Sequence, residues 1–178
     1  MSAQSQNPPP ELINVVIAGL GGQGVLKASD ILAEAAFHAG YDVKKSELHG
    51  MSQRGGSVAS DVRFGEEVLS PMVPTGEADY LVLLSPDEAE PNRHRLRPGG
   101  LLIADAVDEK TLPNRRSLNV ALLGALSTHL PIAEEHWLAA IRTNLPEKLH
   151  ADNERAFALG REHESKRPNK TSGGEGVP

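Results

Sequence analysis

The residues best suited to bind a ligand form a glycine-rich turn near the start of the chain, Gly19-Leu20-Gly21-Gly22-Gln23-Gly24. Its glycines have the G-x-G-x-x-G spacing, and the turn follows a short apolar run and precedes a helical pattern. Glycines let a ligand approach the backbone closely, and the first N–H groups of the following helix point at an anion. The turn therefore predicts an anion-binding site, and Gly22 is a further candidate in it. Gln23 would lie beside the ligand position, which weakens the case for a nucleotide.

An acidic residue stands where a dinucleotide site would need one. Glu47 lies 23 residues after Gly24, near the end of a second expected strand. Dinucleotide-binding folds place there the acid that binds a ribose hydroxyl. Taken alone, the turn and Glu47 indicate a freestanding Rossmann-like dinucleotide-binding module. The alternative is that the glycines only permit close packing of strand on helix, and both interpretations stay open at this point.

A second polar stretch, also rich in glycine, follows directly. Arg54 could clamp a carboxylate or phosphate with its two-pronged guanidinium, and neighbouring backbone amides could join it. His49 has no evident carboxylate or nucleophile as a partner, so we expect a ligand-binding or interface role and no catalytic residue; the alternative is a hydrated surface loop. The candidates in this stretch are His49, Gly50, Met51, Ser52, Gln53, Arg54, Gly55, Gly56 and Ser57.

These loops require a sheet with helices to position them. Apolar runs predict strands over 15–18, 41–48, 80–84 and 101–104, the last entered by a turn at Gly99-Gly100. Apolar residues at helical spacing predict a helix from Gln23 to Ala39. Alternation from Val58 to Phe64, a turn, and Val68-Leu69 predict a β-hairpin.

The last third of the chain has helical patterns only. Asn119 is the expected cap of a buried helix running to about Leu130, and Pro131 is expected to open the next helix. A shorter helix over about 152–162 follows. The expected fold class is therefore α/β, with a Rossmann-like, mainly parallel sheet, an inserted β-hairpin and a helical C-terminal third.

Composition excludes several functions. The chain of 178 residues has a net charge of −6, which lacks the basic footprint of a nucleic-acid-binding protein. There is no apolar stretch long enough for a membrane span and no signal-peptide pattern, so we expect a cytoplasmic protein. There is no cysteine to ligate zinc or an iron–sulfur cluster, and the histidines lack a metal-binding spacing. We expect a disordered leader over 1–12, one domain over 13–165 and a disordered tail over 166–178.

Several segments together resemble one family. The turn Gly19–Leu26, the long stretch Lys45–Val58, and Ser70-Pro71 with Gly76–Asp79 are similar to the gamma-type domain of 2-oxoacid:ferredoxin oxidoreductases. The sequence His-Gly-Met-Ser-Gln-Arg-Gly-Gly at 49–56 is most similar to that of the beta subunits of the indolepyruvate type. The match extends from Asn14 to Gly160, and the long stretch is its most specific part.

The resemblance implies a complex that oxidatively decarboxylates an aryl-2-oxoacid to an acyl-CoA and passes electrons to ferredoxin. It implies that thiamine diphosphate, its Mg and the iron–sulfur clusters lie on a large alpha subunit. This chain would then complete a partner's site and be inactive alone. Arg54 is the candidate to contact CoA phosphates or a partner carboxylate, supported by Gln53 and His49. Substrate choice would lie with the partner.

One segment departs from the family pattern. The family has a further strand and helix between the 101–104 strand and the helix at Asn119, whereas here only 105–118 connects them. Such a length is barely enough for a crossover connection. We expect one βα unit to be missing and the edge of the sheet to be altered.

Overall fold

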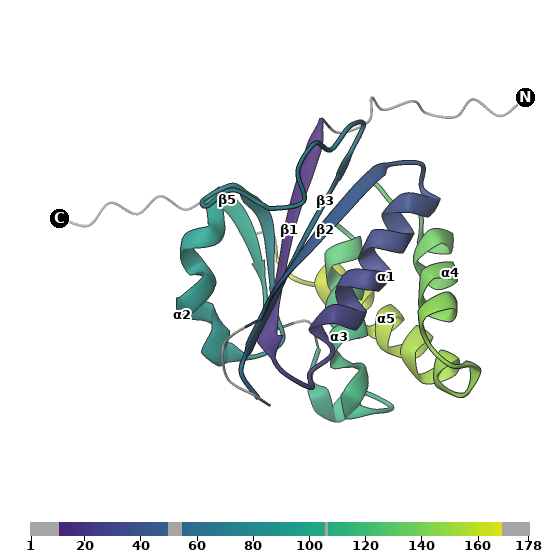
Figure 1. Ribbon diagram of the computed structural model, residues 1–178. Helices are drawn as coiled ribbons and strands as arrows, with labels where there is room; N and C mark the ends of the chain where they lie inside the picture. Colours follow the sequence, from purple (N-terminus) through teal and green to yellow (C-terminus); the bar gives the residue numbers. More distant parts are fainter. Residues whose placement is uncertain (1–10, 50–54, 106, 169–178) are drawn as a thin grey trace, which may run out of the picture.

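A five-stranded mixed sheet forms the centre of the molecule, in the order β2-β3-β1-β4-β5 (Figure 1). The computed structural model describes residues 11–49, 55–105 and 107–168. The strands are β1 (Leu12–Leu20), β2 (Asp42–His49), β3 (Ser57–Gly65), β4 (Ala78–Leu83) and β5 (Leu96–Ile103). β1 pairs in parallel with β4, and β4 with β5, while β3 runs antiparallel to both β1 and β2. Four of the five strands therefore point the same way, which confirms the predicted α/β class.

The predicted hairpin is wrong in one of its strands. β3 does not pair with residues 68–69; it inserts between β1 and β2, with Val58 opposite both Gly19 and His49. Six consecutive β3 residues are buried because the strand is central. The backbone of Val68 is used differently: its N–H donates to the Asp42 carboxylate at 2.8 Å.

The turn predicted at Gly99-Gly100 is also absent, because both glycines lie inside β5. The register between β4 and β5 shifts between Ala78 and Tyr80. A Cβ on Gly100 would lie 2.7 Å from a methyl carbon of Leu96 and 3.0 Å from the Ala78 carbonyl oxygen. The glycine is therefore needed where the strands crowd together at an irregularity.

Four helices cover one face of the sheet, and the short α2 lies near β5 on the other side (Figure 1). The helices are α1 (Val25–His38), α2 (Ala89–Asn92), α3 (Leu118–Ser127), α4 (Glu134–Asn144) and α5 (His150–Ser165), with 3₁₀ turns η1 (Pro86–Glu88), η2 (Arg93–Arg95), η3 (Glu109–Thr111), η4 (Arg115–Ser117) and η5 (Glu147–Leu149). Three predicted boundaries are wrong. The cap of α3 is Ser117, not Asn119, α4 begins at Glu134 rather than Pro131, and α5 is longer than expected.

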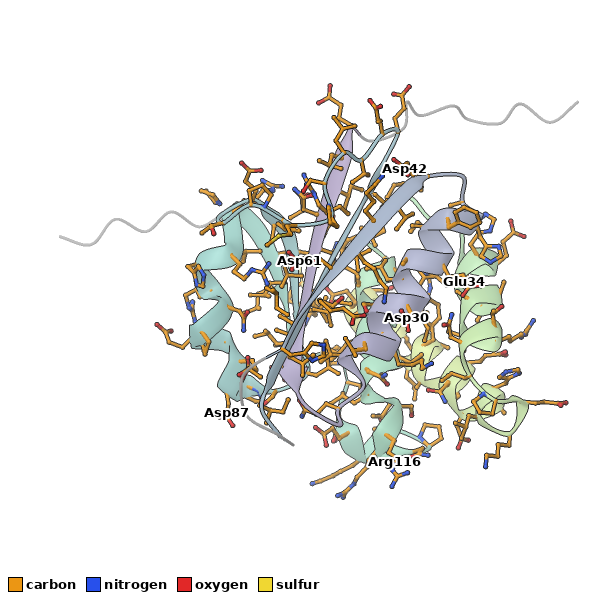
Figure 2. The ribbon with its side chains drawn as sticks, in the orientation of Figure 1. Asp30, Glu34, Asp42, Asp61, Asp87 and Arg116 are labelled. Atoms are coloured by element: carbon orange, nitrogen blue, oxygen red, sulfur yellow. The ribbon has the colours of Figure 1, made fainter. Side chains whose placement is uncertain are left out.

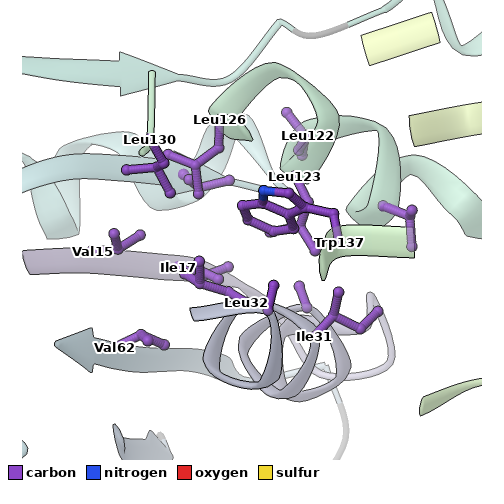
Figure 3. Packing of buried hydrophobic residues seen from close by; sticks show 14 of the residues in the cluster. Val15, Ile17, Ile31, Leu32, Val62, Leu122, Leu123, Leu126, Leu130 and Trp137 are labelled. Carbon is purple, nitrogen blue, oxygen red and sulfur yellow. The ribbon is translucent and has the colours of Figure 1, made fainter. Parts of the chain in front are cut away.

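The main core lies between the sheet and these helices (Figure 3). Trp137 of α4 is fully buried, and its ring lies 5.7 Å from that of Phe157 of α5. Residues 119–127 of α3 are all buried, as an all-round apolar pattern predicts. α3 and α5 cross very closely, because Gly124 and Gly160 bring each helix against the backbone of the other.

The connection from β5 to α3 is short. In the described part of 105–117 there is no strand or α-helix, only η3 and η4. β5 pairs with β4 alone among the described strands and so forms one edge of the sheet. None of the helices in the described ranges has the length and hydropathy of a membrane span.

Candidate functional site

The first glycine turn and the described residues of the second stretch, His49 and 55–57, lie at one end of the sheet. β1 and β2 end there, β3 begins there, and β4 ends there at Leu83. Figure 2 shows this end at the bottom of the molecule, with Asp87 and Arg116 projecting from it, while Asp42, at the start of β2, lies at the opposite end. The carboxyl ends of parallel strands are where open α/β sheets bind ligands.

The Gln23 side chain makes two hydrogen bonds that hold the first turn. The Gln23 Oε1 accepts a hydrogen bond from the Leu20 N–H at 2.7 Å, and its Nε2 donates to the Leu84 carbonyl oxygen at 3.3 Å. A Cβ on Gly19 would lie 2.9 Å from the same Oε1. Gly19 therefore makes room for Gln23. The Gln23 side chain ties β1 to the end of β4 and also lines a cleft beside the turn.

The second stretch packs directly on the first. The Gly21 N–H donates to the Gly56 carbonyl oxygen at 2.9 Å, and a Cβ on Gly21 would lie 3.2 Å from the Gly55 nitrogen. In a dinucleotide site, the second glycine of the motif lets the pyrophosphate approach. In this chain the close approach is made by the chain's own backbone. The two predicted motifs are therefore parts of one structure.

A buried carboxylate holds the end of the second stretch. The Ser57 Oγ donates to the Glu88 Oε1 at 2.7 Å, and Glu88 in η1 is only 4% exposed. The Asn92 side chain donates to the other Glu88 oxygen at 3.1 Å. Sequence reasoning missed Glu88, because its partner lies 31 residues away and no local pattern marks it. Gly50, Met51, Ser52, Gln53 and Arg54 lie outside the described residues.

Glu47 lies apart from the glycine turn. β3 separates β2 from β1, so Glu47 lies two strands away from the strand that leads into the glycine turn. Its carboxylate lies 2.9 Å from the Lys45 Nζ and 3.9 Å from the His49 Nε2. Lys45 also pairs with Asp30 of α1. Burial opposes the charge on Lys45, but its hydrogen bonds to Asp30 and Glu47 outweigh that and raise its pKa.

Two clefts flank the first turn. One has a volume of about 590 Å³ and carries two arginines, Arg115 and Arg116. We call it the arginine cleft; it is lined by Gly22, Gln23, Gly24, Leu84, Pro86, Glu109, Arg115, Arg116 and Leu118. The other, of about 420 Å³, is lined by residues 20–22, 24–27, 49 and 58, which include Lys27 and His49. Glu47 lines neither cleft.

Asn119 supports the turn from the helical layer. Its Nδ2 donates to the Gly24 carbonyl oxygen at 3.1 Å, and its Oδ1 accepts from the Val120 N–H at 2.9 Å. Gly24 has a φ of 85°, and a Cβ there would lie 2.5 Å from the Asn119 Nδ2. Gly24 is thus required both for its left-handed backbone and for the space Asn119 fills.

Comparisons with known proteins show which family has this sequence and fold. The indolepyruvate oxidoreductase subunit IorB of Thermococcus kodakarensis is 37% identical over 188 aligned positions, which cover 83% of this chain and 93% of that subunit. A keto/oxoacid ferredoxin oxidoreductase gamma subunit from Geobacter sulfurreducens has a TM-score of 0.75 at 23% identity and covers 87% of this chain and 99% of that one.

A larger protein contains the same fold. The 2-oxoglutarate:ferredoxin oxidoreductase from Magnetococcus marinus, solved with 2-oxoglutarate, coenzyme A and succinyl-CoA bound, matches 89% of this chain with a TM-score of 0.79 at 22% identity. This chain spans only 32% of that one. Residues 14–114 match the family described as pyruvate ferredoxin/flavodoxin oxidoreductase. The chain therefore belongs to the pyruvate ferredoxin/flavodoxin oxidoreductase family.

Proposed function

We propose that this chain is the small subunit of an indolepyruvate-type 2-oxoacid:ferredoxin oxidoreductase. The observation that carries the proposal is its match along 93% of IorB from Thermococcus kodakarensis. The joined glycine stretches support it, because the hydrogen bond between Gly21 and Gly56 connects two of the segments that carry the family resemblance. The reaction of the complex would be 2-oxoacid + CoA + 2 oxidised ferredoxin → acyl-CoA + CO₂ + 2 reduced ferredoxin + H⁺.

The redox groups would lie on a larger partner subunit. The sequence contains no cysteine, so it has no thiolates for an iron–sulfur cluster. Within the described ranges, no three His, Asp or Glu side chains gather as a metal site. The role left to this chain is to complete the partner's site, and we expect the isolated chain to be inactive.

The end of the sheet that bears both stretches would face that partner. The N-terminus of α1 carries partial positive charge, and the arginine cleft adjoins it. Arg54 remains the candidate to contact a CoA phosphate or a partner carboxylate, with Gln53 and His49 in support. The charges at this end suit an anionic group at the boundary between the subunits.

The test is reconstitution. Co-expression with a large thiamine-diphosphate and iron–sulfur subunit of an indolepyruvate-type oxidoreductase should give a complex that reduces an artificial electron acceptor with indolepyruvate and CoA under anaerobic conditions. Each chain alone should give no activity, and pyruvate should be a poorer substrate. Failure of the tagged chain to retain a large, cysteine-rich protein would refute the proposal.

A thermal-shift measurement tests the dinucleotide alternative. A ligand at 100 times its dissociation constant stabilises a protein by about 2.7 kcal/mol. Because Glu47 is engaged by Lys45 and Gly21 by Gly56, we expect neither NAD nor FAD to raise the melting temperature of the purified chain. A clear rise with either would restore the dinucleotide-binding module.

A further inference from the structure

Glu88 is a buried carboxylate that belongs to neither glycine stretch. It lies in η1, after the end of β4, and is only 4% exposed. Burying a carboxylate costs free energy unless hydrogen bonds satisfy its oxygens. Here neutral donors satisfy both: the Ser57 hydroxyl lies 2.7 Å from Oε1, and the Asn92 amide nitrogen lies 3.1 Å from Oε2. The carboxylate is therefore held within the chain, and one of its contacts leads into the second stretch.

A ring of hydrogen bonds joins three loops at the carboxyl end of the sheet. The Gly21 N–H donates to the Gly56 carbonyl oxygen, which joins the first turn to the second stretch. The Gln23 Nε2 donates to the Leu84 carbonyl oxygen, which joins the first turn to the end of β4. The contact of the second stretch with η1 closes the ring, because η1 follows Leu84 in the same connection. Three segments that are distant in the sequence are thus fixed to one another.

The bond between Ser57 and Glu88 is the link in this ring that two side chains specify. The link between the two stretches joins backbone groups, and the link from the first turn to β4 ends on a backbone oxygen. Ser57 directly follows Gly56, so holding its side chain also holds the Gly56 carbonyl at the first turn. The fit there is close, since a Cβ on Gly21 would lie 3.2 Å from the Gly55 nitrogen. A shift of Ser57 would therefore disturb both stretches.

We propose that Glu88 is a positioning residue of the oxidoreductase complex. Through Ser57 it fixes residues 55–57 against the first turn, and this arrangement receives an anionic group at the boundary between the subunits. The Glu88 oxygens are occupied by Ser57 and Asn92, so Glu88 itself does not contact the anion. That anion is a phosphate of CoA or a carboxylate of the larger subunit. The proposal rests on the proposed function and adds to it a residue that neither glycine stretch contains.

The first test removes the hydrogen bond at its exposed end. Ser57 is exposed, so Ser57→Ala should fold as the unchanged chain does. In the co-expressed complex, this variant should raise either the KM for CoA or the dissociation constant of the large subunit about 10-fold. The kcat at saturating CoA should stay within about two-fold, because the bond acts on binding and not on the chemical step. Ser57→Thr keeps the hydroxyl and should recover most of the loss.

The matched control is Ser60→Ala. It removes a serine hydroxyl from the same strand, one that is fully buried and donates to the Ser46 carbonyl oxygen of β2 at 3.4 Å, outside the ring. This variant should leave the KM for CoA and the affinity for the large subunit unchanged. A loss that Ser60→Ala shared with Ser57→Ala would be a general effect of the strand and would overturn the proposal.

A second measurement uses the isolated chain. Glu88→Gln keeps the shape of the side chain but turns an N–H group toward one of the two donors. The Gly21 amide should therefore exchange about 10-fold faster with solvent in both Glu88→Gln and Ser57→Ala, and the double variant should be no faster than either, since both remove the same contact.

The outcomes are separable. A higher KM for CoA would assign the anion to CoA, and weaker binding of the large subunit would assign it to a carboxylate of that subunit; either supports the proposal. Unchanged exchange at Gly21, or no change in both constants for Ser57→Ala, would overturn the positioning role and leave the subunit assignment intact. No activity of the unchanged chain with the large subunit would refute the proposed function itself.

Discussion

The crossing of α3 and α5 leads to a prediction whose sign is unusual. Replacing glycine by alanine inside a helix normally stabilises it by about 1 kcal/mol, because alanine has the higher helix propensity. At Gly160 of α5 we expect the opposite. The added Cβ would lie 1.9 Å from the Ala121 carbonyl oxygen, 2.8 Å from its carbon and 3.1 Å from the Ala125 nitrogen.

The magnitude follows from what has to move. Real Cβ contacts essentially never fall below 3.0 Å, so the helices must separate by about 1.1 Å at this point. All three atoms belong to the α3 backbone, and no side chain can rotate away. Overpacking costs about 1–3 kcal/mol, and a clash with backbone belongs at the upper end. After the propensity gain, Gly160→Ala should destabilise the chain by about 2 kcal/mol, or about 4–8 °C in melting temperature.

Urea unfolding followed by circular dichroism measures this directly. Ala158→Gly is the matched control, since Ala158 is exposed on the same helix and tests propensity alone. We expect that variant to lose about 1 kcal/mol. If Gly160→Ala proved neutral or stabilising, the close crossing of α3 and α5 would be wrong.

Three further predictions concern polar groups. Asp61→Asn should cost about 3–5 kcal/mol in urea unfolding, because it leaves the mostly buried Arg95 guanidinium without its ion pair; a loss below about 1 kcal/mol would contradict that pairing. Gln23→Ala removes two hydrogen bonds inside the first turn, so the free energy of unfolding should fall by about 1–2 kcal/mol. The Leu20 amide hydrogen should also exchange faster with solvent. An unchanged exchange rate at Leu20 would mean that Gln23 does not hold the turn. The hydrogen bond from Arg142 lowers the pKa of Glu154 below its ordinary 4.5, so Glu154 stabilises the fold above that pH and loses this effect as the pH falls through its lowered value. Glu154→Gln should therefore flatten the acid side of the stability curve, and an unaltered curve would argue against the pair.

Local pattern was sufficient for much of the fold. The apolar run in β1, the glycine turn and the stripe along α1 follow from near neighbours in the chain, and all were located from the sequence. The insertion of β3 could not be found this way. Its alternation from Val58 to Phe64 fits a hairpin with either flanking segment, and only the fit of its two faces in the assembled sheet places it between β1 and β2.

At the candidate site too, some features could be predicted from the sequence and others required the tertiary structure. The sequence identified both glycine stretches and the family resemblance, which the comparisons confirmed. It did not predict that Gly21 would bond to Gly56, or that Gln23 would fill the space over Gly19. Glu88 was missed altogether, because its hydrogen-bond partner Ser57 comes from a distant segment.

By itself, then, the sequence determined that the chain folds as an α/β domain with two glycine-rich stretches and that it has no thiol for a redox cluster. Only the tertiary structure decided which group approaches the backbone of the first turn. A G-x-G-x-x-G spacing specifies a backbone that something can approach closely, but it does not specify what approaches. That depends on strand order: β3 beside β1 brings Gly56 onto Gly21 and leaves Glu47 two strands away.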